Sequence, residues 1–76
     1  MKKELQKKIE LMPEILSTFS GILEEALSEE EKCFDKMSER SQESERGELL
    51  QERIDSLSSA LDSINDAMSY IEEIEF

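Results

Sequence analysis

The chain has 76 residues with one cysteine and no histidine, and its 20 acidic residues outnumber its 9 basic ones, for a formal net charge of −11. A single cysteine excludes an intrachain disulfide, and a chain without histidine offers poor ligands for zinc, so regular helix packing or association must stabilise so short a fold. The negative charge disfavours direct binding to nucleic acid or to an anionic membrane, and favours a basic protein partner. No apolar run approaches the ~20 residues of a membrane span. Because no apolar region follows Met1-Lys2-Lys3, we expect no signal peptide. The lone cysteine suits a reducing compartment, so we expect a cytoplasmic protein.

A first helix is expected over residues 2–37. Its apolar residues alternate at spacings of four and three, the coiled-coil pattern of a helix that packs along another helix. Pro13 interrupts this pattern and either kinks the helix or starts a new one; because the pattern keeps its phase, we favour a kinked single helix. Glu30 is the one charged seam residue, and it either pairs with Arg46 or Arg53 or marks fraying of the seam. The predicted seam comprises Leu5, Ile9, Met12, Leu16, Phe19, Leu23, Ala26, Glu30, Cys33 and Met37.

A polar connection follows over residues 38–44, and a second helix is expected over residues 45–75. Ser41 and Ser44 both suit the N-cap position of that helix. Because short connections between long helices give antiparallel neighbours, the fold class is all-α, an antiparallel two-helix hairpin that forms a single domain over residues 1–76. The second helix carries an unbroken seam of Leu50, Ile54, Leu57, Leu61, Ile64, Met68 and Ile71.

Further apolar residues flank both seams, so the apolar stripe is wider than one partner helix requires. An isolated hairpin would leave these residues in water, whereas a homodimeric four-helix bundle buries them. A monomer that depends on a different partner, or a higher oligomer, are the alternatives. The residues expected to mediate self-association are Ile15, Ile22, Leu27, Phe34, Ala60, Ala67 and Ile74.

Acidic residues line the outward positions of both helices. Carboxylates along a rigid helix can imitate the phosphates of nucleic acid and occupy a basic groove of a protein that binds DNA or RNA. The residues expected to contact such a partner are Glu24, Glu25, Asp55, Asp62, Asp66 and Glu73. No cofactor or metal is expected, and we do not expect an enzyme, because Cys33 has no histidine to activate it and no glycine-rich loop is present.

The connection has a distinctive sequence, Phe34-Asp35-Lys36-Met37-Ser38-Glu39-Arg40-Ser41-Gln42-Glu43-Ser44-Glu45-Arg46-Gly47-Glu48. It resembles the connection of short acidic helical proteins from phages and mobile elements of Gram-positive bacteria, over Phe34 to Glu72. Its most specific part is the run Ser44 to Glu48, while many related proteins have proline where Ser38 stands. That group has no assigned activity, so the resemblance implies a context, a small accessory protein in a bacterial host cell, rather than functional residues.

These observations predict a non-enzymatic protein-binding inhibitor. By analogy with other small acidic phage proteins, the expected class is an anti-defence protein, of the anti-CRISPR or anti-nuclease kind, that imitates nucleic acid with its acidic face. The alternative is a structural or assembly module that uses the apolar stripe for self-association or for docking a partner helix.

Overall fold

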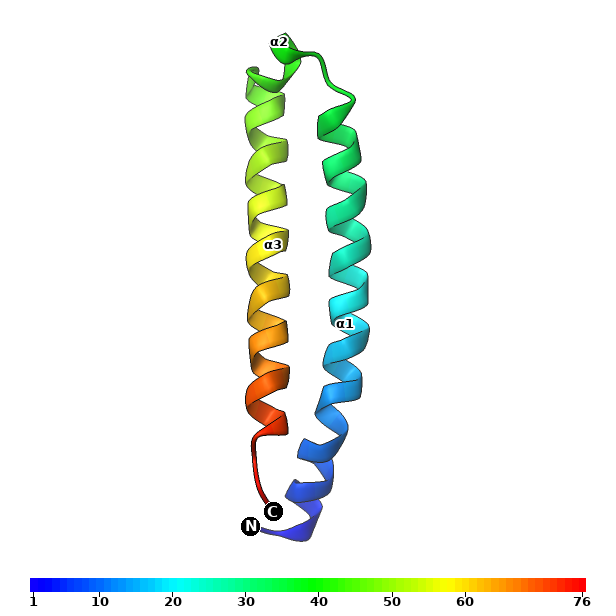
Figure 1. The fold of residues 1–76 in the computed structure, drawn as a ribbon, viewed down its shortest axis with the longest axis vertical. Helices are drawn as coiled ribbons and strands as arrows, with labels where there is room; N and C mark the ends of the chain where they lie inside the picture. The colour runs from blue at the N-terminus through cyan, green and yellow to red at the C-terminus, as the bar shows by residue number, and fades with distance from the viewer.

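The computed structural model describes residues 1–76 and contains helices only, as the sequence predicts. The helices are α1 (Lys3–Asp35), α2 (Glu39–Gln42) and α3 (Glu45–Glu72). The two long helices, α1 and α3, lie side by side and antiparallel, with α2 at one end of the rod and both termini at the other (Figure 1). The radius of gyration is 17.4 Å, against about 11 Å for a compact chain of this length. The rod measures 57 × 15 × 14 Å, so nearly every residue lies near the surface.

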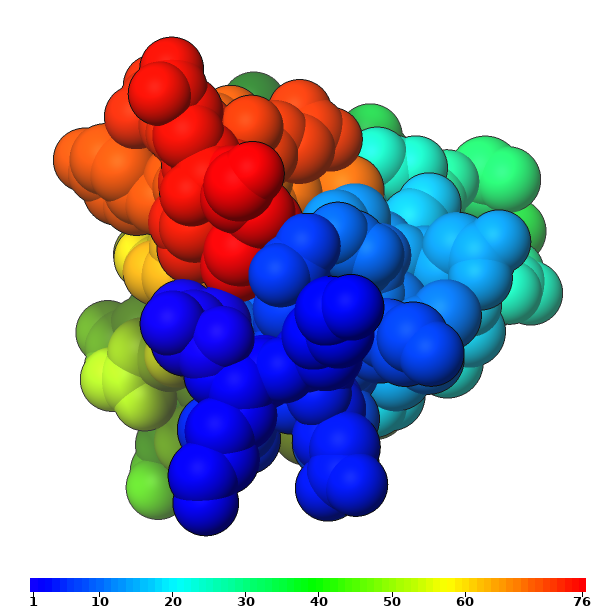
Figure 2. Space-filling model, turned by 90° about the horizontal axis from the view of Figure 1, so that it is seen from below, coloured from blue at the N-terminus to red at the C-terminus, as the bar shows by residue number.

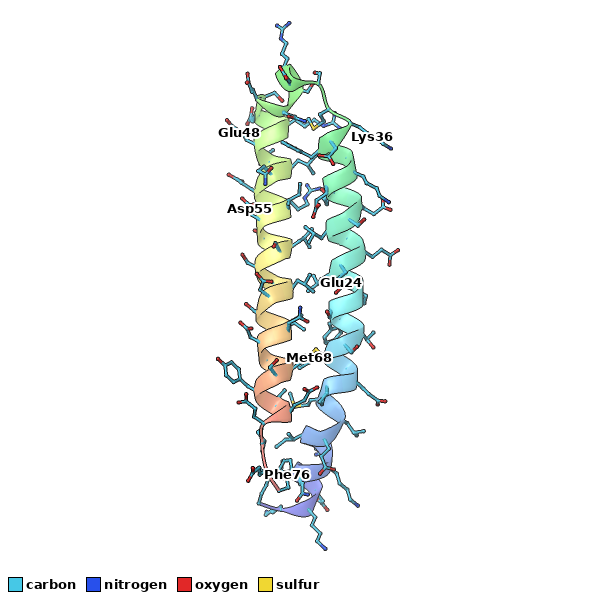
Figure 3. The ribbon with its side chains drawn as sticks, in the orientation of Figure 1. Glu24, Lys36, Glu48, Asp55, Met68 and Phe76 are labelled. Carbon is cyan, nitrogen blue, oxygen red and sulfur yellow. The ribbon has the colours of Figure 1, made fainter.

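The helix bounds differ from the prediction at the end of the first helix and at the C-terminus, whereas α3 begins at Glu45 as predicted. α1 ends at Asp35 and α3 at Glu72, while the connection contains the one-turn helix α2. The residues after α3 leave the helix and lie beside the N-terminal part of α1, where Figure 3 places Phe76. Seen from this end, the first and last residues of the chain are neighbours (Figure 2).

Pro13 lies inside α1, which continues through it as one helix. Proline has no N–H to donate to the carbonyl group four residues earlier and its ring crowds that carbonyl, so a bend is expected there. In Figure 1 the N-terminal part of α1 bends toward the end of α3. The kinked single helix that the sequence favours is therefore observed.

The connection is held by three polar side chains. The Gln42 side-chain amide donates to the carbonyl oxygens of Phe34 at 3.1 Å and Met37 at 3.3 Å, and so ties the start of the connection to α2. The Ser38 hydroxyl accepts from the Ser41 N–H at the start of α2. The Ser44 hydroxyl accepts from the Gly47 N–H, so Ser44 rather than Ser41 is the N-cap of α3.

Gly47 is buried because the connection folds over it. A Cβ atom at this position would meet the carbonyl group of Gln42 and would lie 2.6 Å from the Ser41 oxygen. Gly21, in the middle of α1, has no atom within 4 Å of the corresponding position. Gly47 therefore allows the backbone of Ser41 and Gln42 to pack closely against the first turn of α3. Gly21 allows no such contact within the hairpin.

The seam of α3 is the predicted one. Leu50 is 8% exposed and is the one apolar side chain that is buried rather than half-buried. The other six seam residues of α3 are half-buried against α1, namely Ile54, Leu57, Leu61, Ile64, Met68 and Ile71.

The first helix shows only part of its predicted seam. The predicted residues that are half-buried are Ile9, Leu16, Leu23, Ala26, Glu30 and Met37. The prediction was wrong for the other four, because Leu5, Met12, Phe19 and Cys33 are exposed. The observed row of buried and half-buried residues is Gln6, Ile9, Pro13, Leu16, Ser20, Leu23, Ala26, Leu27, Glu30, Phe34 and Met37.

The loop end of the hairpin explains this choice. There, α1 turns Leu27 and Phe34 toward α3, and these side chains bury more apolar surface than Ala26 and Cys33 would. A continuous helix keeps one rotational setting along its length, so the same setting applies nearer the termini. This rotational setting places Ser20 in the seam between the helices. It leaves the larger side chains of Met12 and Phe19 exposed beside the seam.

Candidate functional site

Two polar contacts between α1 and α3 define the two long sides of the rod. On one side the Ser20 hydroxyl donates to Asn65 Oδ1 at 3.3 Å. On the other side Arg53 Nη1 lies 3.2 Å from Glu30 Oε2, which is the single ion pair of the hairpin. Arg53 is therefore the partner of the charged seam residue. Because residues three, four and seven apart share a helix face, these contacts assign the remaining side chains to one side or the other.

The side marked by Asn65 is acidic, and we call it the acidic side. Asp55, Asp62, Asp66 and Glu73 follow one another at spacings of seven, four and seven residues, so they form one row along the outer surface of α3. All four are exposed. No basic residue occurs between Ile54 and Phe76.

Glu48 extends this row toward the loop, seven residues before Asp55, and it was absent from the predicted set. Figure 3 shows Glu48 and Asp55 on the side of α3 that faces away from α1. The seven-residue interval is visible in the sequence, but Glu48 also lies in the first turn of α3, where an acid interacts favourably with the helix dipole. The acidic row therefore comprises Glu48, Asp55, Asp62, Asp66 and Glu73.

The two predicted acids of α1 lie apart from each other. Glu24 follows Ser20 by four residues and so lies on the acidic side of the rod. Glu25 follows a further 100° around the helix, on the surface of α1 that faces away from α3. Both side chains are exposed. The fold thus groups Glu24 with the acids of α3 and separates Glu25 from them.

The side marked by Arg53 is apolar, and we call it the apolar side. On α3, Ala60 and Ala67 follow Arg53 at intervals of seven residues, so they continue the line that Arg53 begins. Ile74 lies beyond the end of α3, so helical periodicity does not place it on this side; it is 43% exposed and lines a hollow with Pro13 and Phe76.

On α1 the same side carries larger side chains. Met12 and Phe19 precede Glu30 by 18 and 11 residues, which are five and three helical turns, and Ile15 and Ile22 lie next to them. Ile15, Phe19 and Ile22 are 52%, 49% and 58% exposed. Large apolar side chains in contiguous exposed groups mark interaction surfaces. The displacement of Met12 and Phe19 from the seam therefore enlarges the surface available for association.

Leu27 and Phe34 are not part of the apolar side. Both were grouped with the self-association residues, but both are half-buried between α1 and α3. Their apolar surface is largely satisfied within the hairpin. The predicted self-association residues that share the apolar side are Ile15, Ile22, Ala60 and Ala67, whereas Ile74 lies beyond the end of α3.

The hollows of the surface are shallow and lie at the two ends of the rod. A groove of about 280 Å³ near the loop is lined by Glu30, Cys33, Arg46, Leu49, Leu50 and Arg53. A second, of about 290 Å³, lies between the N-terminal part of α1 and the end of α3, beside Pro13 and Phe76. The structure contains no group of three acidic or cysteine side chains that could hold a metal ion.

None of the helices has the length and hydrophobicity of a membrane span.

Comparisons with protein-family models, with curated proteins and with solved structures find no match for this chain.

Proposed function

We propose that this protein is a non-enzymatic binding protein whose acidic side occupies a basic surface of a protein that binds nucleic acid. The observation that carries this proposal is the acidic row of α3. Its five carboxylates are exposed, four of them on the continuous helix α3 and the fifth, Glu73, at its C-cap, and no basic residue occurs from Ile54 to Phe76. A rigid row of like charges matches a rigid basic groove without first having to be ordered, which lowers the entropic cost of binding.

The resemblance of the connection to small proteins of phages and mobile elements supports a more specific role. We infer an inhibitor of a host-defence nuclease, of the anti-CRISPR or other anti-nuclease kind, that acts in the cytoplasm of a bacterial host cell. Such an enzyme holds nucleic acid in a basic channel, and a row of carboxylates competes for the same positive charges. This step rests on analogy with other small acidic phage proteins.

The second candidate function is a structural or assembly module that binds through the apolar side. It is favoured by the exposure of Ile15, Phe19 and Ile22, since a hairpin with no other partner would leave this apolar surface in water. The two candidates use opposite sides of the rod and are not exclusive.

The ionic strength of the binding reaction separates the two candidates. The tagged protein is used to capture partners from a lysate of the bacterial host at ~0.05 M and ~0.5 M salt, where the Debye length falls to a few ångströms. Binding through the acidic side is expected to weaken by more than about tenfold over this range, and free nucleic acid should displace the partner. A partner that is retained at high salt, ignores nucleic acid and is lost from an Ile15→Glu variant would instead establish the assembly function.

A further inference from the structure

We propose that a second copy of this chain covers the apolar side, and that the two copies are related by a two-fold axis parallel to the rod. In this arrangement α1 of each copy lies along α3 of the other, and both connections lie at the same end of the dimer. The acidic rows then face outward on opposite surfaces. The inference concerns the apolar side alone and stands whether or not the acidic side binds a partner.

The size of the apolar side suits a dimer. Leu11, Met12, Ile15, Phe19 and Ile22 of α1 each expose about half of their surface. Together they offer on the order of 500 Å², to which Ala60 and Ala67 of α3 add, against the ~800 Å² that each partner contributes to a stable interface. No acid lies on the apolar side between Met12 and Ala26 of α1. Two chains of like charge can therefore approach through it with their carboxylates turned away.

The two helices carry complementary shapes at matching heights on the apolar side. The pairs Ser20–Asn65 and Glu30–Arg53 fix which residues of the antiparallel helices are level with each other. By this register Ile15 is level with the turn that follows Ala67, and Ile22 with the turn that follows Ala60. A two-fold axis along the rod preserves height and exchanges the helices. It therefore lays the isoleucines of one copy over the alanines of the other, large against small.

Charge follows the same register nearer the loop. Glu29 continues the line of Ile15 and Ile22 one heptad further along α1, while Arg53 and Arg46 continue the line of Ala60 toward the start of α3. The same axis brings Glu29 of one copy to the height of Arg53 of the other. The two arginines line the groove near the loop, which the partner's α1 would cover. Opposite charges thus meet where the apolar surface ends.

The other possible two-fold axis crosses the rod at right angles, and it fits less well. It would lay α1 on α1 and α3 on α3, so that isoleucine met isoleucine and alanine met alanine. Because most of the large exposed apolar residues occupy the half of the rod near the termini, these halves would overlap and Leu49 near the loop would stay uncovered. Glu29 of each copy would then lack the arginines of the other copy that the parallel axis supplies, while Arg53 would keep only its own Glu30.

Sedimentation equilibrium at micromolar concentration tests the surface. The wild type is expected to be a dimer, and Phe19→Glu with Ile22→Glu should raise its dissociation constant by at least about a hundredfold, because two carboxylates enter an apolar interface. The matched control is Ser17→Glu with Ser28→Glu, which adds the same charge to the acidic side and outer surface of α1 and should leave the dimer intact. A monomeric wild type, or a dimer indifferent to the first pair, overturns the proposal.

A distance measurement on the intact chain tests the arrangement while the isoleucines, Phe19 and the alanines of the interface stay unchanged. Arg40 in α2 is replaced by cysteine in a Cys33→Ala background, and spin labels are attached at the tip of the rod. Parallel rods predict a distance between the two labels of roughly 20–30 Å, since packed helices lie ~8–10 Å apart. A distance longer than the 57 Å rod would show that the connections point in opposite directions, and would overturn the two-fold axis proposed here.

Discussion

At the residue scale, the two glycines have opposite roles, and sequence composition alone does not distinguish them. Gly47 leaves no room for a side chain because Ser41 and Gln42 cross directly over it. We expect Gly47→Ala to destabilise the hairpin by about 1–3 kcal/mol, as overpacking of a buried site does. The measurement is the midpoint of urea unfolding, followed by circular dichroism at 222 nm.

Gly21→Ala is the matched control for this substitution. It lies in the middle of α1, where an added Cβ meets nothing, so it should raise stability by up to about 1 kcal/mol through helix propensity. If both alanine variants shifted the midpoint in the same direction, the close packing of the connection over Gly47 would be refuted.

The polar residues of the connection show what a sequence reveals at this scale. Ser44 was one of two N-cap candidates, and the structure selects it. The hydrogen bonds from Gln42 to the carbonyl groups of Phe34 and Met37 were not predicted, because no local rule names the acceptor of a glutamine side chain. The distinctive run from Gln42 to Gly47 is thus explained by the way it ends one helix and starts the next.

At the scale of the helices, element type was predictable and the rotational setting of α1 was not. Two overlapping apolar frames share Ile9, Leu16 and Leu23, and they differ in whether Phe19 or Ser20 faces α3. Sequence reasoning chose the frame with the larger residue, but the packing of Leu27 and Phe34 decided the setting from the far end of the helix. α3 has one apolar frame, so its seam was predicted in full.

The bend of α1 leads to a prediction at the same scale. Pro13 removes one backbone hydrogen bond from an otherwise continuous helix. Pro13→Ala should therefore raise the free energy of unfolding by about 1–3 kcal/mol, measured by urea denaturation. Glu14→Ala, an exposed neighbour in the same helix, is the control and should change stability by less than about 0.5 kcal/mol. A loss of stability in Pro13→Ala would mean that the bend itself holds the N-terminal turns against the end of α3.

At the scale of the whole molecule, the fold turns a mixed surface into two sides with different chemistry. Sequence periodicity found most residues of both sides, since Asp55, Asp62 and Asp66 on one and Ala60 and Ala67 on the other repeat at helical intervals. It did not reveal that Glu24 and Glu25 lie on different surfaces, or that Leu27 is half-buried while Ile22 is exposed. Both differences depend on which face of α1 packs against α3. What either side binds depends on atoms outside this chain, so periodicity alone does not identify the partner.

The most direct test of the proposed function compares two charge reversals of equal size. One replaces Asp62, Asp66 and Glu73 of the acidic row by lysine, and the other replaces Glu4, Glu14 and Glu25, which are exposed on α1 outside the acidic side. The measurement is the dissociation constant of each variant for the nucleic-acid-binding protein captured from the host, at physiological salt. We predict that the first reversal weakens binding by about a hundredfold and the second by less than about threefold. Equal losses, or no loss from the first reversal, would contradict binding through the acidic row.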